Sequence, residues 1–132
     1  MSISPLSILL IGVLGMALAD GKCTPSDVNV IQKSGKFNEF VYHCSYTTWG
    51  SGPGTAECVK NGCGISPGCA ECFGQSTSCG ALCGGPCALA GNPSDEKCQD
   101  CLNSKGCPKA LEECTGITNL PPPPSDRSSS CA

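Results

Sequence analysis

Five cysteines occur within 19 residues, in the stretch CAECFGQSTSCGALCGGPC that runs from Cys69 to Cys87. Cysteine thiolates bind metals, exchange disulfides in Cys-x-x-Cys motifs at helix N-termini, or oxidise to structural disulfides. The chain of 132 residues contains 14 cysteines, and all of them follow residue 19. The first question is therefore which of these three chemistries the sulfur atoms perform.

A zinc site is the first alternative. Cys69 and Cys72 form one Cys-x-x-Cys pair, and Cys98 and Cys101 form a second, so four thiolates are available. However, 25 residues separate the two pairs, which exceeds the usual zinc-ribbon interval of about 15–20 residues. Ten further cysteines would have no role in such a site. We therefore expect no metal and no other cofactor.

A redox site is the second alternative, because Cys69 lies near the start of a predicted helix, where a thiol pKa is lowered. A thioredoxin-like site also needs a βαβ scaffold, and the sequence shows no such pattern. A catalytic pair among twelve other cysteines would exchange with them. The sequence favours the third alternative, structural disulfides.

The N-terminus predicts export to an oxidising compartment. Residues 1–19 contain no charged side chain, include an apolar run from Ile8 to Leu14, and end in Ala-Leu-Ala before Asp20. This pattern is typical of a secretory signal peptide. The run is too short to span a bilayer about 30 Å thick, and no second long apolar run follows. We expect a secreted, extracellular protein without a membrane span.

The composition also requires disulfides. After residue 19, only 15 of 113 residues are Leu, Ile, Val or Phe, which is below the ~20% typical of chains that fold on an apolar core. Each disulfide contributes roughly 2–4 kcal/mol to the stability of the fold. The net charge is −3 and the eight Lys and Arg residues are scattered. This distribution argues against nucleic acid and against an anionic membrane surface as partners.

The spacing of four cysteines and one serine predicts a helix over residues 67–83, because residues three and four positions apart share one helix face. Two shorter helices are expected over residues 92–106 and 108–114, which begin at prolines and end near glycines. The first helix would be followed by a stop at Gly84-Gly85-Pro86. Its periodic residues are Cys69, Cys72, Ser76, Cys79 and Cys83.

If the shorter helices fold back antiparallel on the first, facing residues have position numbers with a nearly constant sum. Four cysteine pairs meet this condition and are predicted to be disulfides. A competing scheme pairs cysteines within each of two similar stretches, residues 69–83 and 98–114. The predicted antiparallel bonds are Cys83–Cys98, Cys79–Cys101, Cys72–Cys107 and Cys69–Cys114.

Residues 27–47 are predicted to form a β-hairpin, because apolar and aromatic residues alternate with polar ones on both sides of a turn at Gly35. The sequence as a whole thus predicts a small disulfide-rich α+β fold, an N-terminal β-hairpin followed by short antiparallel helices cross-linked by disulfides. The expected segments are a signal peptide (1–19), a hairpin and loop (20–56), a disulfide-stapled helical segment (57–118) and a Pro/Ser-rich tail (119–132).

No residue pattern identifies an active site, so we expect a protein that is not an enzyme. The single histidine, His43, would need an acid such as Asp27 or Glu39 and a serine to form a triad. A lone histidine on a strand is usually a surface or packing residue. The sequence contains no nucleophile elbow, P-loop or dinucleotide-binding pattern.

Aromatic residues give the candidate binding surface, since such side chains dominate recognition sites; their alternative role is the small core of the hairpin. The expected partner is an extracellular protein or glycan. A protease inhibitor or defence-type toxin is the alternative function, with residues 50–57 as the exposed loop. Cys131 could form a covalent dimer. The candidate binding residues are Phe40, Tyr42, Tyr46 and Trp49.

Overall fold

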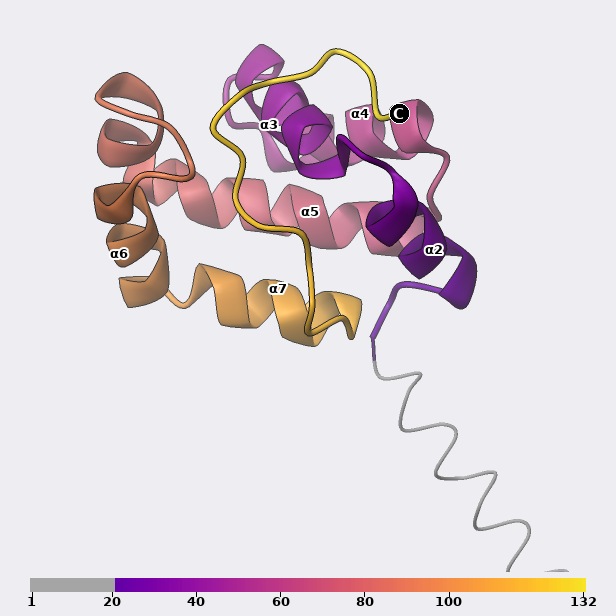
Figure 1. Cartoon of the computed structure of the whole chain (residues 1–132). Helices are drawn as coiled ribbons and strands as arrows, with labels where there is room; N and C mark the ends of the chain where they lie inside the picture. The colour runs from indigo at the N-terminus through magenta and orange to yellow at the C-terminus, as the bar shows by residue number, and fades with distance from the viewer. Residues whose placement is uncertain (1–20) are drawn as a thin grey trace, which may run out of the picture.

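The computed structural model describes residues 21–132 and shows helices joined by short connections (Figure 1). The signal peptide predicted for residues 1–19 lies outside the described residues. No helix among residues 21–132 is long and apolar enough to cross a membrane. The elements are α2 (Pro25–Lys33), α3 (Phe37–Thr47), α4 (Gly52–Cys63), α5 (Pro67–Gly80), the 3₁₀ turn η2 (Ala81–Cys83), the π turn η3 (Gly85–Leu89), α6 (Glu96–Ser104) and α7 (Cys107–Thr115).

Helix α5 is the centre of the arrangement, with α4 packed on one side and α7 running along another (Figure 1). Helices α4 and α5 approach closely because glycines face each other. A Cβ on Gly74 would lie 2.4 Å from the carbonyl oxygen of Gly52, and one on Gly52 would lie 2.9 Å from that of Gly74. Both glycines are therefore needed where the two backbones meet.

Helix starts follow the capping residues of the sequence. Thr24 and Asp27 form a reciprocal capping box at α2, with Pro25 at the first helical position. The Ser51 hydroxyl accepts a hydrogen bond from the Gly54 amide at the start of α4. These side chains satisfy amide donors that have no partner inside the helix.

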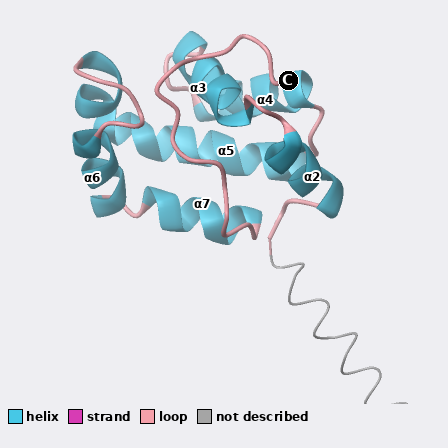
Figure 2. Cartoon of the chain, viewed as in Figure 1, coloured by secondary structure: helices cyan, strands magenta, loops and turns pink. Residues whose placement is uncertain are grey.

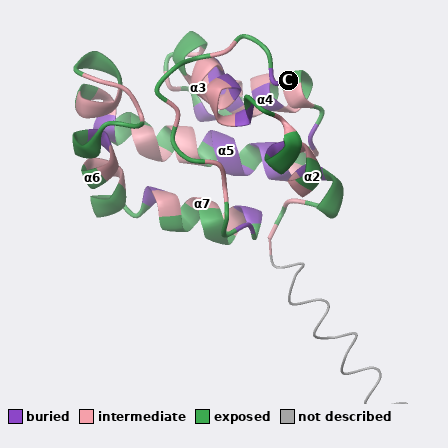
Figure 3. Cartoon of the chain, viewed as in Figure 1, coloured by how far each residue is buried: buried purple, intermediate pink, exposed green. Residues whose placement is uncertain are grey.

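The apolar core lies between α2, α3, α4 and α5 (Figure 3). Phe37 and Phe73 meet edge to face with ring centroids 5.0 Å apart, and Ile31 and Val59 are fully buried beside them. A Cβ on Gly62 would lie 2.1 Å from the Phe40 ring, so this glycine gives the ring its space. Most of the buried large apolar residues thus come from α2 to α5, and Ile117 after α7 completes this core.

The predicted β-hairpin over residues 27–47 is wrong. This segment forms α2 and α3, and Figure 2 shows no strand within residues 21–132. The residues of α3 that are buried, Phe37, Phe40 and Cys44, are spaced three and four apart, so a helical stripe was present alongside the alternating pattern. Packing of this stripe decides the structure, because strand propensity is a weak preference.

The exposed loop predicted over residues 50–57 is also wrong, since α4 begins at Gly52. The inhibitor alternative required this loop. The helices predicted over residues 67–83 and 108–114 are confirmed as α5 with η2 and as α7. The expected stop at Gly84-Gly85-Pro86 is wrong, because η3 continues helical turns through Leu89.

The second predicted helix, over residues 92–106, is present but shorter. Residues 92–95 form a turn in which the Asn92 side chain accepts a hydrogen bond from the Ser94 amide and the Asp95 carboxylate accepts one from the Asn92 amide. Helix α6 then begins at Glu96. Asparagine and aspartate favour such turns over helix interiors.

The tail after Leu120 contains no helix or strand and returns from the end of α7 to α3 (Figure 1). The Asn38 side chain donates hydrogen bonds to the carbonyl oxygens of Pro121 and Pro122, at 2.7 and 2.8 Å. The Ser128 amide donates to the Glu39 carbonyl oxygen at 3.0 Å. The Pro/Ser-rich tail is therefore attached along α3 by specific contacts.

Candidate binding surface

The 14 cysteines form seven disulfides within the chain, and none is free. Four of the bonds connect α5, η2 and η3 to α6 and α7, two join the N-terminal segments to each other or to α5, and one attaches the tail. The pairs are Cys23–Cys69, Cys44–Cys58, Cys63–Cys131, Cys72–Cys114, Cys79–Cys107, Cys83–Cys101 and Cys87–Cys98.

The predicted antiparallel arrangement of the helices is present, but all four predicted bonds are wrong, three of them by one cysteine, while Cys69 bonds instead to Cys23. Cys72, Cys79 and Cys83 each bond to the next cysteine along the returning chain. The reason lies in η3, which turns back and brings Cys87 to Cys98. The predicted pairs Cys83–Cys98, Cys79–Cys101, Cys72–Cys107 and Cys69–Cys114 are replaced accordingly.

The hypothesis of a covalent dimer through Cys131 is corrected as well. Cys131 bonds to Cys63 at the end of α4, so its sulfur atom is already used within the chain. The Ser34 hydroxyl also donates to the Cys131 carbonyl oxygen. These contacts fix the C-terminus against α2 and α4.

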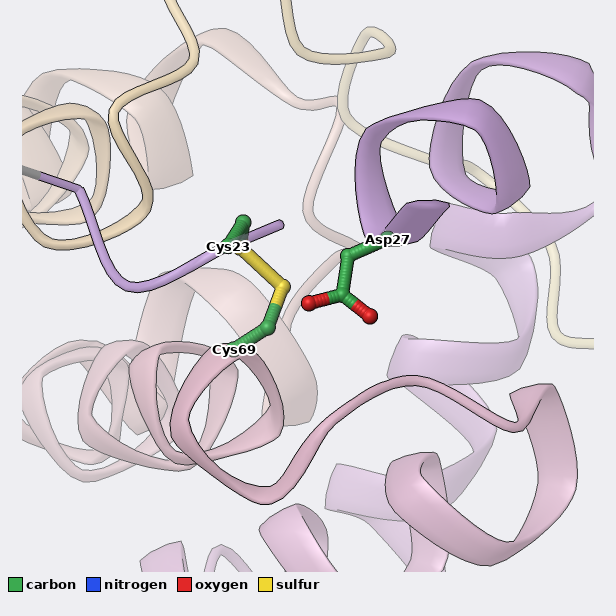
Figure 4. Close-up of side chains that lie close together, drawn as sticks. All are labelled: Cys23, Asp27 and Cys69. Atoms are coloured by element: carbon green, nitrogen blue, oxygen red, sulfur yellow. A yellow bond between two sulfur atoms is a disulfide. The ribbon is translucent and has the colours of Figure 1, made fainter. Parts of the chain in front are cut away.

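One group of sulfur and carboxylate atoms resembles a metal site in composition. Cys23, Asp27 and Cys69 bring their side-chain ligand atoms within 4.8 Å of one another. Figure 4 shows that the two sulfur atoms are bonded to each other beside the carboxylate. Disulfide sulfur has no thiolate to offer a metal, so the group is structural.

Asp27 joins two helix starts. Its carboxylate accepts hydrogen bonds from the Thr24 amide at 2.9 Å, from the Ser66 amide at 2.8 Å and from the Ser66 hydroxyl at 2.5 Å. Burial acts to raise the pKa of Asp27, but the hydrogen bonds from Ser66 and Thr24 outweigh it and lower the pKa below its ordinary value. The carboxylate therefore holds α2 and the start of α5 together as an anion.

The four predicted binding residues separate into three environments. Phe40 is buried in the core, which confirms the packing alternative for this residue. Tyr42 and Tyr46 meet edge to face on α3, and the Arg127 guanidinium of the tail lies 3.7 Å from the Tyr46 ring centroid. Such a cation–π contact covers part of the Tyr46 ring. Trp49 alone is almost fully exposed, at 95%.

The Trp49 side chain is held in solvent by a rigid turn between α3 and α4. The Gly50 amide donates to the Ser45 carbonyl oxygen at 2.8 Å, and the Trp49 amide donates to that of Tyr46 at 3.2 Å. The Cys44–Cys58 disulfide joins the two helices beside this turn. Trp49 itself has φ 58°, a left-handed conformation that glycine usually supplies after a helix.

Two uncharged stretches of sequence meet at this turn. Residues 40–56 and 72–94 contain no Asp, Glu, Lys or Arg, and we call them together the uncharged region. They lie side by side, because a Cβ on Gly50 would lie 3.7 Å from the Ala81 Cβ and one on Gly52 would meet Ser78 and Gly74. The sequence shows both stretches, but only the fold shows that they are neighbours.

The uncharged region carries the exposed large apolar side chains. Among the described residues, four such side chains are exposed, and all four belong to this region: Tyr46 at 50%, Leu82 at 68%, Leu89 at 89% and Trp49 at 95%. Leucine and tryptophan in such positions mark interaction surfaces when they gather rather than occur singly. Trp49 and Tyr46 are among the binding residues predicted from the sequence, whereas the two leucines are not, since their cysteine-rich context predicts only a helix cross-linked by disulfides.

A polar hollow of about 510 Å³ lies between α3 and the tail. It is lined by Tyr42, His43, Ser125, Asp126, Arg127 and Ser129. The tail thus places two serines and an aspartate around the same hollow as the histidine, whereas the acids considered from sequence, Asp27 and Glu39, do not line it. Asp27 is engaged at the two helix starts, and the Glu39 carbonyl oxygen binds the tail. Within residues 21–132, no hydrogen bond joins the lining side chains to one another as a catalytic triad would require.

Comparisons of the chain with protein-family models, with curated proteins and with solved structures find no match. The assignment of a function therefore depends on the geometry described above. What that geometry establishes is a small, cysteine-rich protein with seven disulfides, an architecture that fits an extracellular disulfide-stabilised protein.

Proposed function

We propose that this protein is secreted and acts as a non-catalytic binding protein, with the uncharged region as its binding surface. Export provides the oxidising conditions in which seven disulfides form and persist. The single histidine and the dispersed carboxylates take no part in this function. The N-terminal 19 residues serve as the cleaved export signal.

The observation that carries the proposal is the position of Trp49. The chain has one tryptophan and few large apolar residues, and burial of each would stabilise the fold by roughly 1.5–3 kcal/mol. Nevertheless the tryptophan and two leucines point into solvent. A chain with so small an apolar core gains nothing in stability from this arrangement, which supports a role in recognition for these side chains.

Export is tested by the mass of the protein in the medium of secreting cells. We expect an N-terminus at Asp20 and a deficit of fourteen hydrogens from the reduced mass, two for each of the seven bonds. Retention of residues 1–19, or a protein confined to the cell interior, would contradict the proposal.

Binding is tested by adding purified protein to the surface of the cells that secrete it. We expect the wild type to be retained on the surface, and Trp49→Ser and Leu82→Ser to be released into the medium. Glu113→Ser on α7 is the matched control, because Glu113 is exposed and lies outside the uncharged region. Equal retention of all four proteins would show that the uncharged region is not the binding surface.

A further inference from the structure

We propose that the partner of the uncharged region is the surface of a zwitterionic lipid bilayer, into which Trp49, Leu82 and Leu89 insert. This inference rests on the proposed function and gives its binding surface a chemical class of ligand. The protein would lie on the membrane surface without crossing it.

The side chains are of the types that enter the interfacial layer of a membrane. Tryptophan is enriched at membrane–water interfaces, since its ring is apolar and its indole N–H keeps a polar partner. Leu82 and Leu89 add aliphatic surface from η2 and η3, which follow α5 directly. Several exposed apolar groups on one region give the buried area on which interfacial binding depends.

The charge pattern selects neutral lipid. An anionic bilayer attracts basic residues at about 1 kcal/mol each, and the uncharged region offers no Lys or Arg over its two stretches. It also contains no Asp or Glu, and the Arg127 guanidinium over the Tyr46 ring and the Asp95 carboxylate that binds the Asn92 amide are of opposite sign. Because neither sign dominates there, an anionic bilayer gains no net attraction over phosphocholine headgroups. The hydroxyls of Thr47 and Thr48, which precede Trp49, donate to carbonyl oxygens of α3 at 2.9 and 2.7 Å, so neither brings an unpartnered donor to the membrane interface.

The shape of the surface favours a soft partner over a pocket-bearing one. Trp49, Leu82 and Leu89 line neither the hollow between α3 and the tail nor the groove between α4 and α5. They project instead, and Trp49 does so from a turn that hydrogen bonds and the Cys44–Cys58 disulfide hold in place. Because the backbone of the turn is already fixed, only the side chain loses conformational entropy when it inserts.

The experiment titrates the disulfide-bonded protein with phosphatidylcholine vesicles while the emission of Trp49 is recorded. Because Trp49 is the only tryptophan, its emission reports this turn alone. We expect a shift to shorter wavelength with saturation, and no tighter binding when phosphatidylserine is added. Vesicle flotation then measures the variants, since Trp49→Ser has no tryptophan emission.

In flotation, Trp49→Ser and the double variant Leu82→Ser/Leu89→Ser should each bind roughly tenfold more weakly, as expected when large apolar side chains no longer leave water. Glu113→Ser should bind as the wild type does. Intact mass confirms seven disulfides in every variant, so a weaker signal is not misfolding.

Three outcomes overturn the inference. They are an unchanged emission with phosphatidylcholine, tighter binding to phosphatidylserine that salt abolishes, and a shift that follows protein concentration without lipid. The last would identify a second copy as the partner, and sedimentation equilibrium would show the dimer. If vesicles fail while retention on cells still depends on Trp49, the lipid inference falls and the proposed binding function stands.

Discussion

The two halves of the molecule are stabilised by different chemistry. Helices α2 to α4 bury aromatic and aliphatic side chains against α5, among them Ile31, Phe37 and Val59. In η2, α6 and α7 the buried apolar residues are half-cystines, Cys83, Cys98 and Cys107. The comparison shows that disulfides here replace an apolar core in one half and supplement it in the other.

Complete reduction should have the largest effect. We expect a thiol reductant in excess to unfold residues 81–115 entirely, because this half has no apolar core of its own. Two disulfides, Cys72–Cys114 and Cys79–Cys107, hold it to α5, and two more cross-link it internally. Each bond constrains the unfolded chain by roughly 2–4 kcal/mol. Hydrogen exchange should show protection lost first in α6 and α7, with α2 to α4 opening later or only partly. Equal protection of both halves after reduction would remove the distinction.

Truncation of the apolar core is expected to have the next largest effect. Phe37→Ala should lower the free energy of unfolding by about 3–5 kcal/mol, since the ring is buried against Phe73. Leu102→Ala in α6 is the matched control and should cost less than ~1.5 kcal/mol, because this side chain is only half-buried. Urea unfolding with the disulfides intact measures both. Similar losses would mean that the α6 half also depends on apolar packing.

Asp27 connects α2 to the start of α5 within the apolar half, because it caps α2 and binds Ser66 before α5. Asp27→Asn should cost about 2 kcal/mol, as charge-assisted hydrogen bonds become neutral ones. The pKa of Asp27 is lowered in the folded protein, so the folded state holds fewer protons than the unfolded one near that pKa. Its stabilisation is present above the ordinary value of 3.8 and is lost as the pH falls through the folded pKa.

The pH dependence of the unfolding free energy tests whether the charge of Asp27 is responsible. Unfolding free energies measured between neutral pH and pH 2 should fall more steeply for the wild type than for Asp27→Asn below about pH 4. Parallel curves would show that the carboxylate contributes nothing beyond its neutral form.

The sequence predicted the disulfide half better than the apolar half. Cysteine spacing and flanking prolines and glycines indicated α5 and α7, since these signals are local. The alternating residues around Phe40 and Tyr42 suggested strands, although Thr24, Pro25 and Asp27 already formed a helix-start pattern. The predicted strand was wrong because the aromatic residues of this segment fit both the two-residue period of a strand and the three-to-four-residue spacing of a helix.

The disulfide register and the binding surface could not be read from the sequence for a different reason. Both depend on contacts between distant segments: Cys87 reaches Cys98 only because η3 turns back, and Gly50 reaches Ala81 only because α4 packs on α5. The exposure of Leu82 and Leu89 likewise follows from what surrounds them. Local sequence patterns therefore identified helices and candidate binding residues, but not which distant segments pack against them.

The smallest expected effect is a gain in the free energy of unfolding, whereas the changes above all lower it. It separates the contribution of Trp49 to stability from its role in recognition. Trp49 occupies the left-handed region at φ 58°, which costs a non-glycine residue about 1–2 kcal/mol, while its exposed ring makes little compensating contact. Trp49→Gly should therefore raise the free energy of unfolding by about 1 kcal/mol, less the entropy that glycine adds to the unfolded chain. The same variant should lose surface binding.

Gly35→Ala is the control for glycine effects and should leave binding unchanged. Gly35 has no positive φ, and a Cβ there would meet no atom within 4 Å. A Trp49→Gly variant that is less stable by urea unfolding would show that the tryptophan supports the fold, and the argument that its exposure serves recognition would then fail.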